Sequence, residues 1–348
     1  MVYFSGLRLG RVDFEAAFRA SISMLAPLLV LYAFGDLQLS AYATFGAFTS
    51  LYGRYEAYRQ RITTVAVAGL ALLTVISTAT VAAAFDWPAP VRLAALFIIT
   101  AGGVVLSSVM RWIPFGPIFY VFGFSVCVII PTSPSQVLPR IGLAAAAAAF
   151  SWLVCMSGWM VRRRAPDTVR RRLRTLTSSP RAPGAASDPV VYGVALETTV
   201  ALAVALWLAS LTTLGHGYWA AVTVAATLPR PYAPHAFTRI FHRVLGTAAG
   251  VVVAGMYLYL QPPLLVVILV IGVCQFGAEI FVGKIYGVAL LFITPLALSV
   301  GKLSTAMSTE SLLTDRLFET LIGGVVAAIV VWIVKFVGRY RTPVAGTD

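Results

Sequence analysis

Long runs of apolar residues, separated by short polar turns, make up most of this chain. An apolar run of about 20 residues can cross a bilayer as an α-helix, so the pattern predicts an all-α polytopic membrane protein with about 12 membrane segments. In the first part of the chain the expected segments are residues 18–34, 41–52, 62–85, 91–109, 115–130 and 141–160. In the second part they are residues 190–214, 218–228, 244–260, 264–280, 285–300 and 317–337.

The second segment of each part is too short to span a membrane as a straight helix. Each contains a tyrosine near its start, Tyr42 or Tyr218, and each is followed by a polar turn and an arginine, Arg61 or Arg243, before a small-residue helix. Short, interrupted segments at matching places in two halves of a transporter point to its binding site. We therefore expect two six-segment repeats, parallel because six is an even number. The alternative is a similarity of composition between apolar helices.

Four regions follow from this pattern. Residues 1–160 form the first membrane repeat, 161–189 an Arg-rich linker, 190–338 the second membrane repeat and 339–348 a tail. The linker opens with clusters of arginine and ends in a stretch rich in Ser, Pro, Ala and Gly. Such a basic segment favours a cytoplasmic position beside anionic lipid headgroups.

The composition agrees with a membrane protein, because 59% of the residues are hydrophobic and only 11% are charged, against about 25% charged in soluble domains. A net charge of +13 would suit a nucleic-acid partner. The arginines, however, lie in short clusters between apolar runs, which is the positive-inside pattern of cytoplasmic loops. We expect a multi-pass protein of the cell (inner) membrane, with the lipid bilayer as partner, no nucleic acid, and both termini in the cytoplasm.

No catalytic or metal-binding pattern is visible. The sequence lacks a phosphate-binding GxxxxGK[ST] loop and a GxGxxG dinucleotide fingerprint. His216, His235 and His242 lie in one region without a neighbouring carboxylate or cysteine, and a metal site needs about three protein ligands. The three cysteines stand in apolar runs without a CxxC pair. We expect neither an enzyme, nor a cofactor, nor a metal.

Two carboxylic acids inside apolar segments are candidates for proton coupling, because ionisable residues within a membrane are costly. Glu197 stands about two turns into the segment 190–214, and the alternative for it is a hydrogen-bonded contact between helices. Glu279 stands near the end of the segment 264–280, where the alternative is an ion pair with Lys284.

Arg61 and Arg243 are expected at the N-terminal ends of their helices. There an arginine and the helix N-terminus together attract a carboxylate, although membrane topology alone also explains a cation at that place. Tyr42, Tyr218 and Trp219 flank the same place. They would contact an aromatic ring, or else form part of the aromatic belt at the membrane surface.

Several motifs in the second part occur in a fixed order. They are Tyr218-Trp219-Ala220, a proline-rich turn, Arg243 to Gly250, Tyr286-Gly287, Ile293-Thr294-Pro295, and Arg316 with Thr320 to Gly323. Together they resemble the membrane domain of the fusaric acid resistance and aromatic acid exporter family. The first part is a degenerate copy, because Gly46-Ala47-Phe48 lacks the Tyr-Trp pair.

The resemblance implies export of aromatic or other amphipathic organic anions, driven by the proton gradient. Relatives often carry a sizeable cytoplasmic domain, and only the short linker stands in that place here. The family is also similar to aluminium-activated malate transporters, in which paired six-span subunits surround an anion pore. A fused chain of this kind would be an internal pseudo-dimer with its pathway between the halves, and a homodimer is the other possibility.

The sequence thus predicts an exporter or permease of small organic anions. The residues expected along the substrate pathway are Arg243, Arg61, Tyr218, Trp219, Tyr42, Arg239 and Thr294. Glu197 and Glu279 are expected to couple transport to protons. Two alternatives stay open: a passive organic-anion channel, and a non-transporting accessory protein of the cell envelope.

Overall fold

The structure is a computed structural model that describes residues 2–4, 7–164, 176, 180–212, 214–215, 217–228, 235–305 and 307–338. Nearly all of them are helical, and nine of the helices in this described part are long and apolar enough to cross a membrane. Most of the Arg-rich linker, the proline-rich turn 229–234, His216 and the tail 339–348 lie outside the described residues. The chain is a multi-pass membrane protein.

A short antiparallel hairpin precedes the helices, with β1 (Val2–Phe4) paired to β2 (Leu7–Leu9). The all-α prediction missed it, because three-residue strands are too short to leave an alternating pattern.

The helices of the first half of the chain are α1 (Arg11–Phe34), α2 (Ser40–Ala47) with the 3-10 turn η2 (Phe48–Leu51), α3 (Tyr58–Ala84), α4 (Ala89–Met110), α5 (Ile118–Cys127) and α6 (Val137–Arg164). Those of the second are α8 (Pro189–Ser210), α9 (Tyr218–Thr227), α10 (Ala236–Leu258), α11 (Leu264–Phe281), α12 (Tyr286–Ser304) and α13 (Thr309–Gly338). Short 3-10 turns, η1 (Leu37–Leu39), η3 (Pro134–Gln136) and η4 (Pro183–Ser187), connect some of them.

Every expected segment contains a helix, but several boundaries differ from the prediction; helix α1, for example, begins seven residues before the expected start. The segment expected at 115–130 is the ten-residue helix α5, because Pro114 and Pro117 cannot donate the backbone hydrogen bonds of an earlier turn. Helices α10 and α13 each begin eight residues before the expected start. Their polar first turns resembled loops in the sequence, yet buried Asp315 and Arg316 show that part of this polar stretch packs inside the protein.

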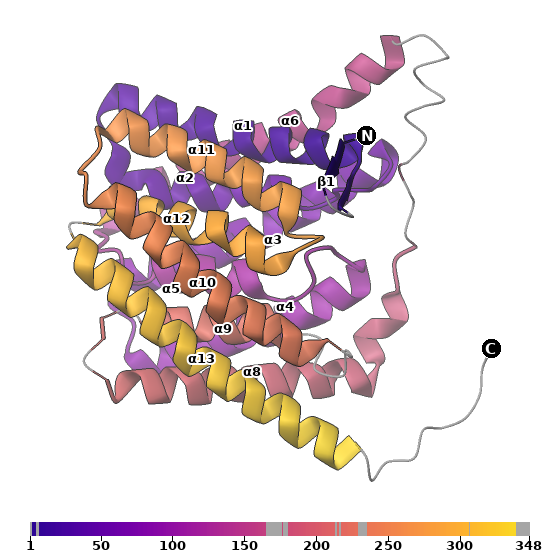
Figure 1. Ribbon diagram of the computed structural model, residues 1–348, viewed down its shortest axis with the longest axis vertical. Helices are drawn as coiled ribbons and strands as arrows, with labels where there is room; N and C mark the ends of the chain where they lie inside the picture. The colour runs from indigo at the N-terminus through magenta and orange to yellow at the C-terminus, as the bar shows by residue number, and fades with distance from the viewer. Residues whose placement is uncertain are drawn as a thin grey trace.

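The two halves contact each other through reciprocal helix pairs. Helix α1, the first of its half, packs along α11, the fourth of the other half, and α8 packs along α4 in the same way. Helix α5 contacts α9, and α12 contacts α2. Figure 1 shows α1 beside α11 at one edge of the bundle and α8 at the opposite edge. The two short helices, α2 and α9, therefore both lie inside the bundle.

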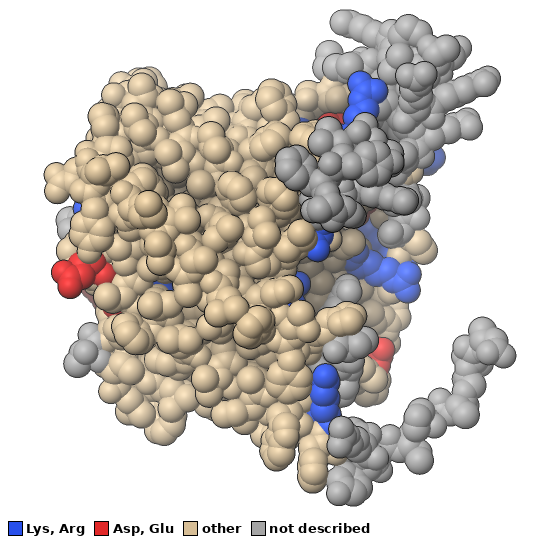
Figure 2. All heavy atoms as spheres, viewed as in Figure 1, with Lys and Arg blue, Asp and Glu red and all other residues tan. Residues whose placement is uncertain are grey.

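The outer surface fits a lipid environment. Large apolar side chains such as Ile98, Leu138 and Met256 are more than 70% exposed. Figure 2 shows lysines and arginines gathered at the end of the molecule that carries the hairpin, while the broad face is almost free of charged side chains. An uncharged band between two polar ends is the surface expected of a membrane protein.

Small residues bring α10 and α12 close together. Cβ atoms added to Gly246 and Gly250 would lie 2.7 Å from the carbonyl oxygens of Gly287 and Leu290 respectively. Small residues four apart are the usual means of close helix packing in membranes. Thr294, expected along the substrate pathway, packs against Gly250 in this contact.

Candidate functional site

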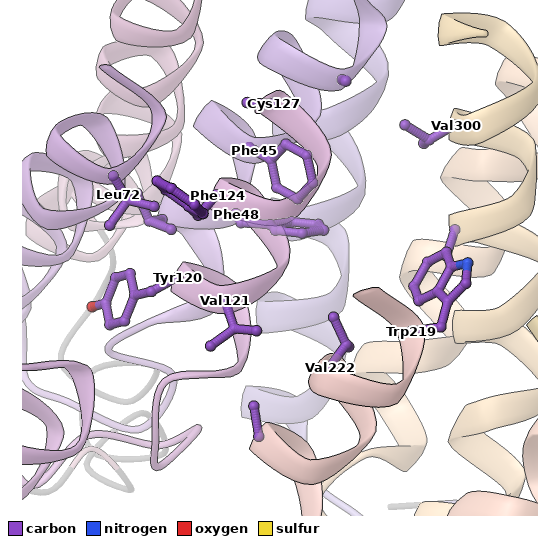
Figure 3. Close-up of a cluster of buried hydrophobic side chains, with 14 of the residues drawn as sticks. Phe45, Phe48, Leu72, Tyr120, Val121, Phe124, Cys127, Trp219, Val222 and Val300 are labelled. Atoms are coloured by element: carbon purple, nitrogen blue, oxygen red, sulfur yellow. The ribbon is translucent and has the colours of Figure 1, made fainter. Parts of the chain in front are cut away.

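A small pocket lies where the two halves meet. It is lined by Phe45 of α2, Phe122 of α5, Tyr218 and Trp219 of α9, and Val300 of α12, together with neighbouring residues. The four helices of two of the cross-contacts, α5 with α9 and α12 with α2, all contribute to it. Figure 3 shows Phe45 and Trp219 on opposite sides of this junction, with Val300 on the Trp219 side.

Four aromatic rings form part of the pocket wall, and aliphatic and small residues form the rest. The Phe122 ring centroid lies 4.9 Å from that of Trp219 and 5.0 Å from that of Phe45. Phe122 also stacks on Tyr218 at 6.5 Å. The cavity volume is about 30 Å³, which holds about one or two water molecules and is too small for an aromatic acid. Passage of such a solute would require these rings to separate.

Carboxylates from α13 hold the start of α9 beside the pocket. The Trp219 N–H donates to Oε2 of Glu319 at 3.1 Å, and the Gly215 N–H donates to Oδ2 of Asp315 at 3.2 Å. Negative charge is favourable at a helix N-terminus, where backbone N–H groups lack partners. Arg316 lies between Asp315 and Glu319 in the sequence. Its guanidinium stacks 3.8 Å from the centre of the Trp219 ring. Helix α13 thus contacts both the backbone and the side chain of Trp219.

The expected arginines of the second repeat converge on Tyr286. Arg243 is 2% exposed and donates to the Tyr286 hydroxyl at 3.0 Å. Arg239 lies 4.4 Å from the centre of the Tyr286 ring and donates to the Ala226 carbonyl at 2.8 Å. Arg243 is the eighth residue of α10, so the expectation that it stands at the helix N-terminus is wrong. The early start of α10 moves it two turns into the helix.

The matching arginines of the first repeat belong to an ion-pair network. Arg61 is fully buried, donates to the Gly53 carbonyl at 2.9 Å, and lies 3.8 Å from the carboxylate of Glu15. Arg54 pairs with Asp13 at 3.0 Å and with Glu279 at 3.1 Å. Because Glu279 belongs to α11, this network joins the two halves.

Lys284 pairs with Asp13 at 3.1 Å, and Glu279 pairs with Arg54. The alternative that Glu279 forms an ion pair with Lys284 is therefore corrected. Glu279 does form an ion pair, but its partner is Arg54 from the other half of the chain. That partner stands in the turn after η2, about 225 residues away in sequence, which is too far for local spacing to reveal.

The remaining expected site residues lie apart from the pocket. Tyr42 is fully buried, and Arg140 donates to its hydroxyl at 3.3 Å. Glu197 is half-buried on α8. The structure therefore brings Tyr218 and Trp219 to the pocket and Arg239 and Arg243 to Tyr286. It places Arg61, Tyr42 and Thr294 in other parts of the core.

Sequence reasoning assigned no site role to the residues that surround Trp219, although Arg316 was part of one of the ordered motifs. Arg316 and Glu319 are buried at 1% and 0% exposure, although an ionisable pair three residues apart at the start of an apolar segment was a visible signal. Phe45 and Phe122 carried no signal, since a phenylalanine in an apolar run is indistinguishable from any core or lipid-facing residue.

Glu56 is a titratable group outside the spans whose pKa is shifted. It lies in the turn between η2 and α3, and burial raises the pKa of its carboxyl. A hydrogen bond with Thr64 and the charges of Arg61 and Arg181 act in the opposite direction without cancelling the effect.

Residues 201–330 match the family model described as fusaric acid resistance protein-like. This segment runs from α8 into α13 and contains Trp219, Arg243 and Arg316. The resemblance drawn from the ordered motifs is confirmed for this part of the chain.

Two relatives match shorter stretches. "Uncharacterized protein slr1298" of Synechocystis sp. is 36% identical over 121 residues, which cover 34% of this chain and 16% of that protein. "Uncharacterized membrane protein YvaC" of Bacillus subtilis (strain 168) is 26% identical over 141 residues, which cover 40% of this chain and 22% of that protein. The chain thus matches less than a quarter of the length of either relative. No solved structure matches it.

Proposed function

We propose that this protein is an exporter or permease of aromatic and other small organic anions, and that its pathway runs between the two repeats. The observation that carries the proposal is the aromatic pocket formed jointly by α2, α5, α9 and α12. A pocket lined mainly by hydrophobic and aromatic side chains, with a few polar groups, is the usual surround of a small-molecule site. The match of residues 201–330 to a fusaric acid resistance protein-like model adds the solute class.

The reciprocal contacts support two parallel repeats, 1–160 and 190–338, related by an axis along the membrane normal. A pair such as α1 with α11 is repeated by α8 with α4, and α5 with α9 by α12 with α2. Such reciprocity is the signature of a two-fold interface, in which the same surfaces meet twice. In this arrangement the chain is an internal pseudo-dimer, and the pocket lies near its axis. The arginine clusters favour cytoplasmic termini in the cell membrane.

Coupling to protons is the finer part of the proposal. Protonation of Glu279 would neutralise its carboxylate and release Arg54, a contact that ties α11 to the first repeat. Glu197, half-buried on α8, is the second candidate. Replacing either with Gln should leave passive movement intact and abolish accumulation driven by a pH gradient.

The test is flux of labelled benzoate in liposomes that contain the purified full-length protein, with and without a pH gradient. Trp219→Ala removes an aromatic wall of the pocket and should reduce the flux strongly. Trp207→Ala is the matched control, since Trp207 is 61% exposed on α8 and does not line the pocket.

The outcomes separate the three functions. Gradient-driven movement that is lost in Trp219→Ala and retained in Trp207→Ala supports a coupled transporter. Movement that follows the benzoate gradient and ignores pH indicates a channel. If no carboxylate moves in the wild type, the transport proposal is rejected in favour of an accessory membrane protein.

A further inference from the structure

Arg316 differs from the other buried arginines that the structure describes. Arg19, Arg54, Arg61, Arg140 and Arg243 each donate at least one hydrogen bond to another residue. Arg316 is 1% exposed, and its Nε and Nη1 atoms have no hydrogen-bond partner among the described residues. A buried cation with unmet N–H donors is costly, so such a group calls for a partner that the chain itself does not supply.

A second buried arginine faces the same region. Arg316 stands on α13, which packs along α10, the helix that carries Arg243. The Nε atom of Arg243 lacks a hydrogen-bond partner among the described residues, while its Nη1 atom donates to the Tyr286 hydroxyl. Two neighbouring helices of the second half therefore each carry a buried arginine with unmet N–H donors.

The nearby carboxylate does not neutralise this cluster by direct contact. Glu319 accepts the Trp219 N–H with its Oε2. In the described part of the chain, no carboxylate oxygen lies within 4.0 Å of a nitrogen of Arg243 or Arg316. Asp315 and Glu319 instead accept backbone N–H groups at the start of α9, so neither carboxylate meets the free N–H donors of Arg316.

We propose that Arg316 and Arg243, with the hydroxyl of Tyr286, form a buried binding site for the carboxylate of an organic anion. The identity of the anion rests on the proposed function, but the existence of the site does not. The planar guanidinium presents N–H donors in a fork that matches a carboxylate, which favours this group over a spherical halide.

Trp219 connects this site to the pocket between the repeats. Its indole ring lines the pocket and also stacks on the Arg316 guanidinium. Its Nε1–H is buried and has no hydrogen-bond partner among the described residues. Once the pocket rings separate to admit an aromatic carboxylate, its ring would meet Trp219 while the carboxylate reached Arg316. Trp219 is the specificity-determining residue in this arrangement, because it offers a stacking surface that an aliphatic acid uses poorly.

Equilibrium binding of labelled benzoate to the purified full-length protein in lipid nanodiscs tests the site without requiring transport. We expect saturable binding that unlabelled benzoate displaces better than acetate, and acetate better than chloride. Arg316→Gln should weaken benzoate binding by about tenfold or more, because it removes a charged hydrogen-bonding partner. Arg92→Gln on α4 is the control, since it changes the net charge equally outside the cluster.

Two further variants test the site if Arg316→Gln does not fold. Arg316→Lys keeps the charge but loses the fork, and Tyr286→Phe removes only a hydroxyl, so both should weaken benzoate binding by a smaller factor. The proposal is overturned if all three variants bind benzoate as the wild type does, if chloride displaces benzoate as well as acetate does, or if the wild type binds none. Benzoate binding without any flux would reject the transport function and keep the site. Benzoate flux that is unchanged in the Arg316 variants would keep the transport function and reject the site.

Discussion

Buried arginines in the two halves of the chain have different partners. In the first half, Arg54 and Arg61 contact Asp13, Glu15 and Glu279, while Arg140 donates to Tyr42, Thr132 and Gln136. In the second, Arg243 and Arg316 contact Tyr286 and Trp219 instead. Arg54 and Arg61 hold helices together through ion pairs, whereas Arg316 has unmet N–H donors among the described residues and is the arginine that we propose for a ligand.

This difference gives the repeats separate tasks. The ion-pair network ties α1, α3 and α11 together at the end of the molecule that carries the hairpin. The arginine and aromatic cluster of the second repeat lies beside the pocket. The family match covers residues 201–330, which lie within the repeat that we propose to hold the anion. Duplication followed by such divergence would keep one repeat as a scaffold and the other as the binding half.

The sharpest test of this comparison is the loss of an arginine from each repeat. Arg54→Met leaves Asp13 and Glu279 buried without their shared cation, which should cost about 3–5 kcal/mol of stability. Arg316→Met breaks no ion pair and should cost less. The measurement is the thermal unfolding midpoint of each purified variant in one detergent.

Arg59→Met is the control for this pair, because Arg59 is exposed at the start of α3. It should unfold at the wild-type temperature. If Arg316→Met destabilises the protein as much as Arg54→Met does, the second arginine is structural and the contrast between the repeats disappears.

A smaller effect is expected from the close contact of α10 with α12. Gly246 follows Arg243 by three residues, and the corresponding residue after Arg61 in the first repeat is Thr64. A Cβ atom at Gly246 would lie 2.7 Å from the Gly287 carbonyl oxygen, a backbone atom that cannot turn aside. Gly246→Ala should therefore cost about 1–3 kcal/mol through overpacking.

Gly193→Ala is the matched control, since a Cβ at Gly193 on α8 meets no atom within 4 Å. It should be neutral or slightly stabilising, because Ala favours a helix over Gly. Thermal unfolding of both variants provides the measurement. If the two variants were equally stable, α10 and α12 would separate easily to accept a Cβ atom, and the close contact between them would not be rigid.

The sequence predicted the helices well and the site only in part, for physical reasons. Apolar runs bounded by prolines and charges reveal where helices lie, because bilayer thickness sets their length. They do not reveal which face of a helix meets which neighbour, so Phe122 and the partner of Glu279 could not be found. Arg316 was misplaced for a related reason: polar residues at the start of α13 resemble a loop until their contacts with α9 are seen.

The smallest expected effect concerns Glu56, beside Arg61 in the first repeat. Burial raises the pKa of this carboxyl above its ordinary value of 4.5, so the folded protein binds the proton more tightly than the unfolded chain does. Stability from this group is therefore present at low pH and is lost as pH rises from 4.5 through the folded-state pKa. Glu56→Gln should match the wild type below that window and be slightly more stable than the wild type above it, as measured by unfolding at a series of pH values. A variant less stable at neutral pH would show that the Glu56 carboxylate is needed as a partner of Arg61, and the balance of charge in the first repeat would then depend on Glu56 as well as Glu15.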